Sequence, residues 1–106
     1  MKTWLLVAVL SVSSAVSAAD RVFSIYGVHD LSCGKYVQDV NNNPQAKSAY
    51  GWWVAGFISG LNVARERFTT TDNQAHDLWL LKYCNEHPLE PFITAAAGLD
   101  SALTKK

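Results

Sequence analysis

Two cysteines, Cys33 and Cys84, limit the fold of this chain more than any other feature. They lie far apart in sequence, and no Cys-x-x-Cys motif of a redox site is present. In an oxidising compartment we expect them to form one disulfide; the alternative is two free thiols, one of them reactive. Closing a loop of about 50 residues stabilises a fold by about 4 kcal/mol in the chain-entropy model. A small domain has about 5 kcal/mol without such a bond, so the disulfide decides whether the chain folds.

The amino terminus has the pattern of a cleaved secretory signal. Lys2 supplies a positive start, residues 4–12 form an apolar run, and the small residues 17–19 precede Asp20. The apolar run has nine residues, whereas a membrane-spanning helix needs about 20. We therefore predict that residues 1–19 are a signal peptide and that the product is exported to a bacterial periplasm, with no membrane span after cleavage. The alternative is a buried amino-terminal helix.

The remaining residues 20–106 are expected to form a single domain. Removing residues 1–19 from the 106 leaves 87 residues, which is a small single domain. Lys2 is the only charge removed, so eight Lys and Arg stand against nine Asp and Glu, a net charge of −1 with neutral histidines. Because there is no basic surplus to bind phosphates, nucleic acid is disfavoured as a partner.

Hydrophobic periodicity and helix-ending residues predict an all-α fold with four or five helices. Residues 21–28 are rich in β-branched and aromatic types and predict a short extended arm or strand. Asn and Pro at 41–44 and the polar run TTTDNQ at 69–74 break the helical pattern, as does His87-Pro88. The expected helices cover residues 32–40, 45–67, 73–86 and 88–103, with caps at Asp30 or Ser32 and at Thr71 or Asp72.

The second predicted helix carries the residues that we single out for packing and binding. Gly56 and Gly60 lie one turn apart, so we expect another helix to approach closely there. Trp52 and Trp53 are consecutive, and on a helix their side chains point about 100° apart. One of them, together with Tyr50, is therefore expected to be exposed as a protein-binding or self-association face. The alternative is a helix that is buried on two sides.

No catalytic or cofactor site is predicted. The histidines His29, His76 and His87 do not form a His-xxx-His pair, and the cysteines are expected to be oxidised, so a zinc site is disfavoured. Ser59 stands in a Gly-x-x-Ser-Gly context inside a helix, which is not the Gly-x-Ser-x-Gly elbow of a hydrolase. We expect a non-enzyme that has neither a metal nor a cofactor.

Three short segments resemble the HdeA/HdeB-like superfamily of small periplasmic helical proteins. These are Ser32-Cys33, the WVAGF segment 53–57 and the YCNEHP segment 83–88, followed by an Ala-rich helix. The resemblance covers most of residues 30–103 and implies a single-disulfide helical fold. Members of that family are dimers near neutral pH that open in acid and hold unfolding clients. The extra tryptophans of the second helix and the TTTDNQ linker depart from the family pattern and leave its dimer face unassigned here.

The same segments are similar to the Tai-type immunity proteins, which bind and block amidases delivered by neighbouring bacteria. We therefore expect a non-catalytic periplasmic protein-binding module, with acid-stress chaperoning as the first hypothesis and an effector-binding immunity protein as the alternative. The partners would be protein clients, one effector enzyme, or a second copy of the chain. Protonating the nine carboxylates and three histidines would take residues 20–106 from −1 to +11, because eight Lys and Arg and three His would then carry charge. Such like-charge repulsion loosens any compact protein in acid.

Overall fold

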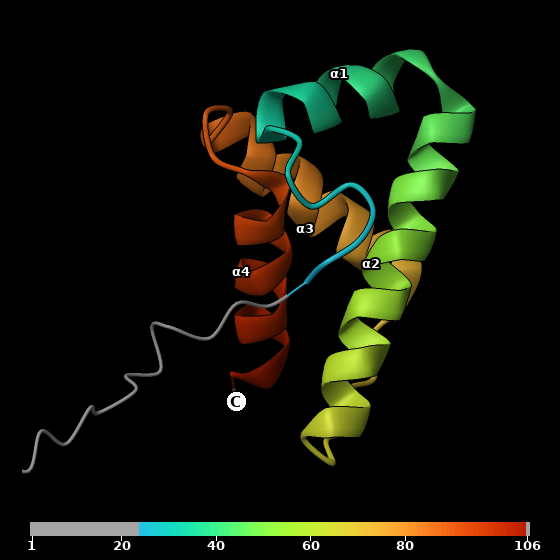
Figure 1. Ribbon diagram of the computed structural model, residues 1–106, viewed down its shortest axis with the longest axis vertical. Helices are drawn as coiled ribbons and strands as arrows, with labels where there is room; N and C mark the ends of the chain where they lie inside the picture. The colour runs from blue at the N-terminus through green and yellow to red at the C-terminus, as the bar shows by residue number, and fades with distance from the viewer. Residues whose placement is uncertain (1–23, 106) are drawn as a thin grey trace, which may run out of the picture.

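A computed structural model describes residues 24–105, and the predicted signal peptide, residues 1–19, lies outside this range. The described chain folds into four α-helices and contains no strand, which confirms the all-α prediction (Figure 1). Within these residues, only an isolated β-bridge pairs Ser32 with Pro91. No helix of the described part is long and apolar enough to cross a membrane. The helices are α1 (Cys33–Asn42), α2 (Pro44–Ala64), α3 (Asn73–Glu86) and α4 (Phe92–Thr104).

Side-chain caps fix where the first three helices begin. The Ser32 hydroxyl accepts a hydrogen bond from the Lys35 backbone N–H, and the Asp72 carboxylate accepts one from Ala75. The Asn43 side chain caps α2, whose first residue is Pro44, a residue suited to the first turn of a helix. Each cap satisfies a backbone donor that the helix leaves free.

Two helix boundaries differ from the prediction by more than two residues. Helix α2 ends at Ala64 and not at residue 67, and Glu66 has a positive φ of 50°, which no helical residue has. Helix α4 begins at Phe92 and not at residue 88. Pro91 disfavours helical geometry at the residue before it, so Glu90 cannot continue a helix started at Pro88.

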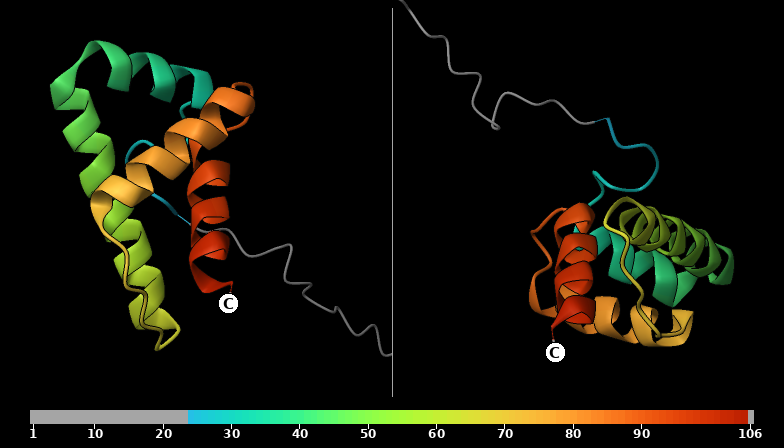
Figure 2. Two further views of the ribbon diagram at one scale, coloured as in Figure 1. Left: turned by 180° about the vertical axis from the view of Figure 1, so that it is seen from behind. Right: turned by 90° about the horizontal axis from the view of Figure 1, so that it is seen from below.

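The four helices enclose one core. Helix α1 lies across one end of the molecule, α2 and α4 run away from it on opposite sides, and α3 crosses between them on the other face (Figures 1 and 2). The rings of Tyr36, Tyr50 and Phe92 meet at the centre, with centroids 4.7 to 5.2 Å apart. The other buried side chains of the core are Cys33, Val54, Ile58, Leu80, Cys84, Ala95 and Leu99.

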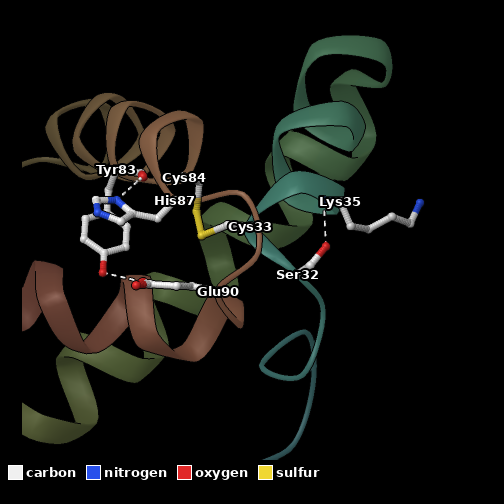
Figure 3. The surroundings of a disulfide bond; sticks show 7 residues. All are labelled: Ser32, Cys33, Lys35, Tyr83, Cys84, His87 and Glu90. Carbon is white, nitrogen blue, oxygen red and sulfur yellow. Dashed lines mark hydrogen bonds between the residues drawn. A yellow bond between two sulfur atoms is a disulfide. The ribbon is translucent and has the colours of Figure 1, made fainter.

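The predicted disulfide between Cys33 and Cys84 is present, and both residues are fully buried (Figure 3). It joins the first residue of α1 to the last turns of α3. The backbone N–H groups of Cys33 and Gly34 donate to the carbonyls of Glu90 and Pro88, so the α3–α4 loop closes over the bond. A Cβ on Gly34 would lie 3.2 Å from the Pro88 carbonyl oxygen, so this close approach favours glycine.

The segment before α1 is an irregular arm. Residues 24–28 do not form the strand allowed by the sequence pattern, and residues 21–23 lie outside the described range. The arm is held by hydrogen bonds from the backbone of Phe92 and Ile93 to the carbonyls of Leu31 and His29. It therefore docks on the start of α4, and Leu31 packs against the core.

Candidate protein-binding site

The structure separates the three aromatic residues that were expected on one face of α2. Trp52 is 74 % exposed and belongs to the surface. Tyr50 is only 4 % exposed, and its hydroxyl donates a hydrogen bond of 2.9 Å to the Asp39 carboxylate. The prediction that Tyr50 is exposed is therefore wrong. It occupies the helix position that faces α1 and the core.

Trp53 is half-buried and has a structural role. Its indole N–H donates to the Tyr26 carbonyl at 2.6 Å, and its ring stacks on Phe57 with centroids 5.3 Å apart. A Cβ on Gly27 would lie 2.5 Å from the Trp53 ring, and Gly27 has a φ of +106°. Trp53 is thus the residue that anchors the arm to α2.

Gly56 and Gly60 do not pack against another helix in the described chain. Both are exposed, and no atom lies within 4 Å of the place where a Cβ would stand. The expected close helix approach within the monomer is therefore wrong. With Trp52 and the 79 %-exposed Val63, the two glycines form an uncharged stripe that we call the α2 outer face.

A cleft of about 290 Å³ lies between α1, the first turns of α2, and α3. Its wall combines apolar side chains with a carboxylate, an ammonium group and two amides. We call it the Asp77 cleft. The residues that line it are Tyr36, Val40, Asn41, Lys47, Gln74, Asp77, Leu78 and Leu81.

Asp77 is the chemically distinctive group of this cleft. It is half-buried, and within residues 24–105 its carboxylate makes neither a hydrogen bond nor an ion pair. Burial raises the pKa of Asp77, while the charges of Lys47 and His76 oppose that rise. Burial, together with the negative charge of Asp77, also raises the pKa of Tyr36. A half-buried carboxylate without a partner is costly, which marks the cleft as a candidate binding site.

A second cluster of charges ties the end of α2 to α4. The buried Asp100 carboxylate pairs with Arg65 at 2.9 Å and also with Arg67. Arg67 donates a further hydrogen bond to the Asn62 side chain, whose amide group in turn donates to Thr69. This Asp100 cluster holds the last turn of α2 and the start of the linker against α4.

The histidines are placed separately. His87 donates a hydrogen bond from its Nδ1–H to the Tyr83 carbonyl oxygen at 2.9 Å, and its ring stacks on the Tyr83 ring (Figure 3). The ring of His76 contacts the Thr71 hydroxyl at 2.7 Å. The buried Nδ1 atoms of His76 and His29 have no hydrogen-bond partner among residues 24–105. In the part of the chain that the structure describes, no three His, Cys, Asp or Glu residues are grouped so that they could hold a metal ion.

Sequence reasoning missed Asp77 and Asp100, although both leave a signal in the helical pattern. Asp77 stands four residues before Leu81 and seven before Cys84, so a carboxylate continues a core-facing stripe of α3. Asp100 stands four residues after Ala96 and three before Leu103 on the inner side of α4. An acidic residue at a core position of a helix predicts either a buried ion pair or a functional group. Asp100 forms such a buried ion pair, and Asp77 is a candidate functional group.

Comparison with known proteins adds no family assignment. No family model, no curated protein and no solved structure matches this chain.

Proposed function

We propose that this protein is a non-catalytic, exported protein-binding module that holds unfolding proteins in acid, as its resemblance to the HdeA/HdeB-like superfamily implies. One observation carries the proposal. The helices are tied covalently at one end and by ionisable groups elsewhere, so acid can release part of the fold while the rest stays closed.

The covalent tie lies where α1 begins, α3 ends and α4 begins, because Cys33 is the first residue of α1 and Cys84 precedes the end of α3 by two residues. Asp100 lies in the second half of α4 and pairs with Arg65 and Arg67, which directly follow α2. The ends of α2 and α4 lie on the side of the molecule away from α1 (Figure 1). A neutral Asp100 side chain would keep an acceptor oxygen but would lose the charge attraction to both guanidinium groups. The far end of α2 would then separate from α4 while the disulfide keeps the other end closed.

A second carboxylate supports opening at the α1–α2 corner. Asp39 accepts hydrogen bonds from Lys35 at 2.7 Å and from Tyr50 at 2.9 Å, and these bonds lower its pKa. Strong acid removes this tie as well, while the exported chain gains positive charge. Repulsion between the like charges then favours an open form.

Opening at these places would expose apolar surface next to side chains that are already accessible. Trp52 and Val63 project from α2, and Phe68 is 87 % exposed in the linker that follows. Val54 and Ile58 belong to α2 as well, and both are buried in the closed form. Together they would provide a wide apolar surface of the kind that binds unfolded chains.

Client protection across pH tests this function. The full chain is expressed with its own leader, the exported oxidised product is purified, and an aggregation-prone enzyme is diluted into it between pH 7 and pH 2. We expect light scattering to be suppressed at low pH only, together with increased binding of an apolar dye. Absence of protection at every pH would contradict the chaperone function.

The alternative is an immunity protein that blocks one secreted effector such as a cell-wall amidase, and the Asp77 cleft favours it. A small cleft with charged groups in its wall suits one specific partner better than many unrelated clients. Inhibition of one amidase at a one-to-one ratio and neutral pH would support this role, as would a toxin gene adjoining this gene. Protection of many clients in acid would favour the chaperone instead.

A further inference from the structure

The Asp77 cleft has the size of a receptor for one side chain. Pockets for drug-sized molecules occupy about 300–1,000 Å³, and this cleft, at about 290 Å³, lies at the lower limit of that range. Its mouth is flanked by Leu78, which is 70 % exposed, so a bound protein would contact apolar surface around the opening. The volume therefore fits a single long side chain that enters from a partner.

The charge of the cleft decides which side chain fits. The Asp77 carboxylate is half-buried and forms no ion pair among residues 24–105, so it has lost part of its solvation, and Lys47, the cation in the same cleft, acts on it only through its charge. A cationic group placed against it would recover that cost and would gain from the reduced solvent around the pair. The raised pKa of Asp77, caused by burial, agrees with a carboxylate that lacks such a partner.

The other polar groups of the cleft favour a guanidinium over an ammonium group. Asn41 and Gln74 line the cleft beside Asp77, so their amide oxygens add acceptors to the carboxylate. A guanidinium carries five N–H donors in a planar fork and can satisfy several acceptors at once. Its methylene stem can pack on the apolar wall formed by Val40 and Leu81.

The charged and titratable groups around Asp77 come from all three helices. Lys47 of α2 lines the cleft but forms no ion pair with Asp77, and its charge would oppose entry of a second cation. His76 of α3 contacts Thr71, and α1 contributes the Tyr36 hydroxyl. The Lys47 ammonium group therefore competes with an incoming cation for the Asp77 carboxylate, and removing its charge should strengthen binding of that cation.

We propose that the Asp77 cleft receives one arginine side chain of a bound protein, with the guanidinium paired to the Asp77 carboxylate. This inference rests on the proposed protein-binding function and gives that function a defined contact at neutral pH.

The test uses a small probe on the full, exported, oxidised protein at pH 7. Nα-acetyl-arginine amide is titrated while backbone amide shifts are followed by NMR, and Nα-acetyl-citrulline amide serves as the uncharged isostere. We expect saturable shifts for amides around the cleft with the arginine probe, and binding at least tenfold weaker for citrulline. Equal binding of both probes, or shifts remote from the cleft, would overturn the proposal.

Three variants locate the contact. Asp77→Asn should weaken binding of the arginine probe at least tenfold, Lys47→Met should strengthen it severalfold, and the matched control Glu86→Gln, on an exposed part of α3, should leave it unchanged. Asp77→Asn should also raise the melting temperature at pH 7, because it removes an unpaired half-buried charge. A lowered melting temperature would show that Asp77 has a structural partner and would contradict the proposal.

The experiments distinguish failure of the arginine-binding proposal from failure of the proposed chaperone function. The probe titration uses neither acid nor an unfolding client, so failure of arginine binding leaves acid client protection to be judged by light scattering alone. Loss of client protection with intact arginine binding would instead retain the cleft and favour a specific partner at neutral pH.

Discussion

The Asp39 carboxylate accepts a hydrogen bond of 2.9 Å from the hydroxyl of Tyr50, and this contact joins α1 to α2 at the corner between the two helices. Lys35, one turn before Asp39, binds the other carboxylate oxygen at 2.7 Å. The hydrogen bonds from Lys35 and Tyr50 lower the pKa of Asp39. Burial and the nearby Asp39 charge raise the pKa of Tyr50, so the tyrosine stays the donor. The corner is therefore more stable while Asp39 is ionised.

Asp39→Asn should destabilise the protein at neutral pH, and the effect should disappear in acid. Because the folded state lowers the pKa of Asp39 below its usual value of 3.8, the wild type gains stability above that value. This gain is lost as the pH falls through the lowered pKa. Urea unfolding at pH 7 and at pH 2 measures the difference. Asp30→Asn, at an exposed residue, is the control and should have little effect at either pH.

Two glycine substitutions should have opposite effects on stability. Gly56→Ala should stabilise the fold by about 0.5–1 kcal/mol, because it lies inside α2 with open space around it. Gly27→Ala should destabilise it by at least about 1 kcal/mol, because of the positive φ and the contact with Trp53. Thermal unfolding measures both. A destabilising Gly56→Ala whose effect grows with protein concentration would indicate that a second copy covers the α2 outer face.

The sequence predicted well those features that depend on residues close together in the chain, such as helix caps and helix ends. Ser32 and Asp72 act as caps, and the Asn-Pro break before α2 falls where the turn residues placed it. These features depend on neighbours within a few positions, so a single sequence contains the information. The disulfide was also predictable, because two cysteines leave one possible pairing within the chain.

Features that depend on tertiary contacts were less predictable. Tyr50 and Trp52 are close in sequence, yet only the position of α1 decides that Tyr50 is buried and Trp52 exposed. The glycines of α2 permit close packing, but whether a helix lies against them is set by the whole arrangement. Asp77 became a candidate only when the structure showed a carboxylate that is half-buried and unpaired.

Asp100→Asn should destabilise the protein by about 3 kcal/mol, the cost of leaving a largely buried charge without its partner. That charge is Arg67, whose side chain is 17 % exposed, whereas Arg65 is 57 % exposed. Arg65→Gln is therefore the matched control and should cost less than about 1 kcal/mol. Denaturant titration at pH 7 compares the two. Equal effects would contradict the assignment of Arg67 as the principal partner.

Cys33→Ser combined with Cys84→Ser should lower the free energy of unfolding by about 4 kcal/mol, as expected for a closed loop of 51 residues. Because a domain of this size has little stability to lose, the variant should be partly unfolded at 37 °C. Circular dichroism during heating, with the reduced wild type as a second measurement, checks this. A reduced protein as stable as the oxidised one would show that the helices need no covalent tie.

Trp52 and Trp53 are adjacent in sequence, but we expect their substitutions to affect different properties: client binding for Trp52 and folding stability for Trp53. Trp52→Ala removes an exposed ring and should change the free energy of unfolding by less than about 0.5 kcal/mol. Trp53→Ala removes the stack on Phe57 and the hydrogen bond to Tyr26, and should cost about 2 kcal/mol.

If the α2 outer face binds clients, Trp52→Ala should reduce client protection at low pH although the fold is intact. Light scattering with each variant, at equal concentration and after its stability has been measured, makes the comparison. Full protection by Trp52→Ala would exclude this tryptophan from the binding surface and shift attention to apolar groups that become accessible only on opening.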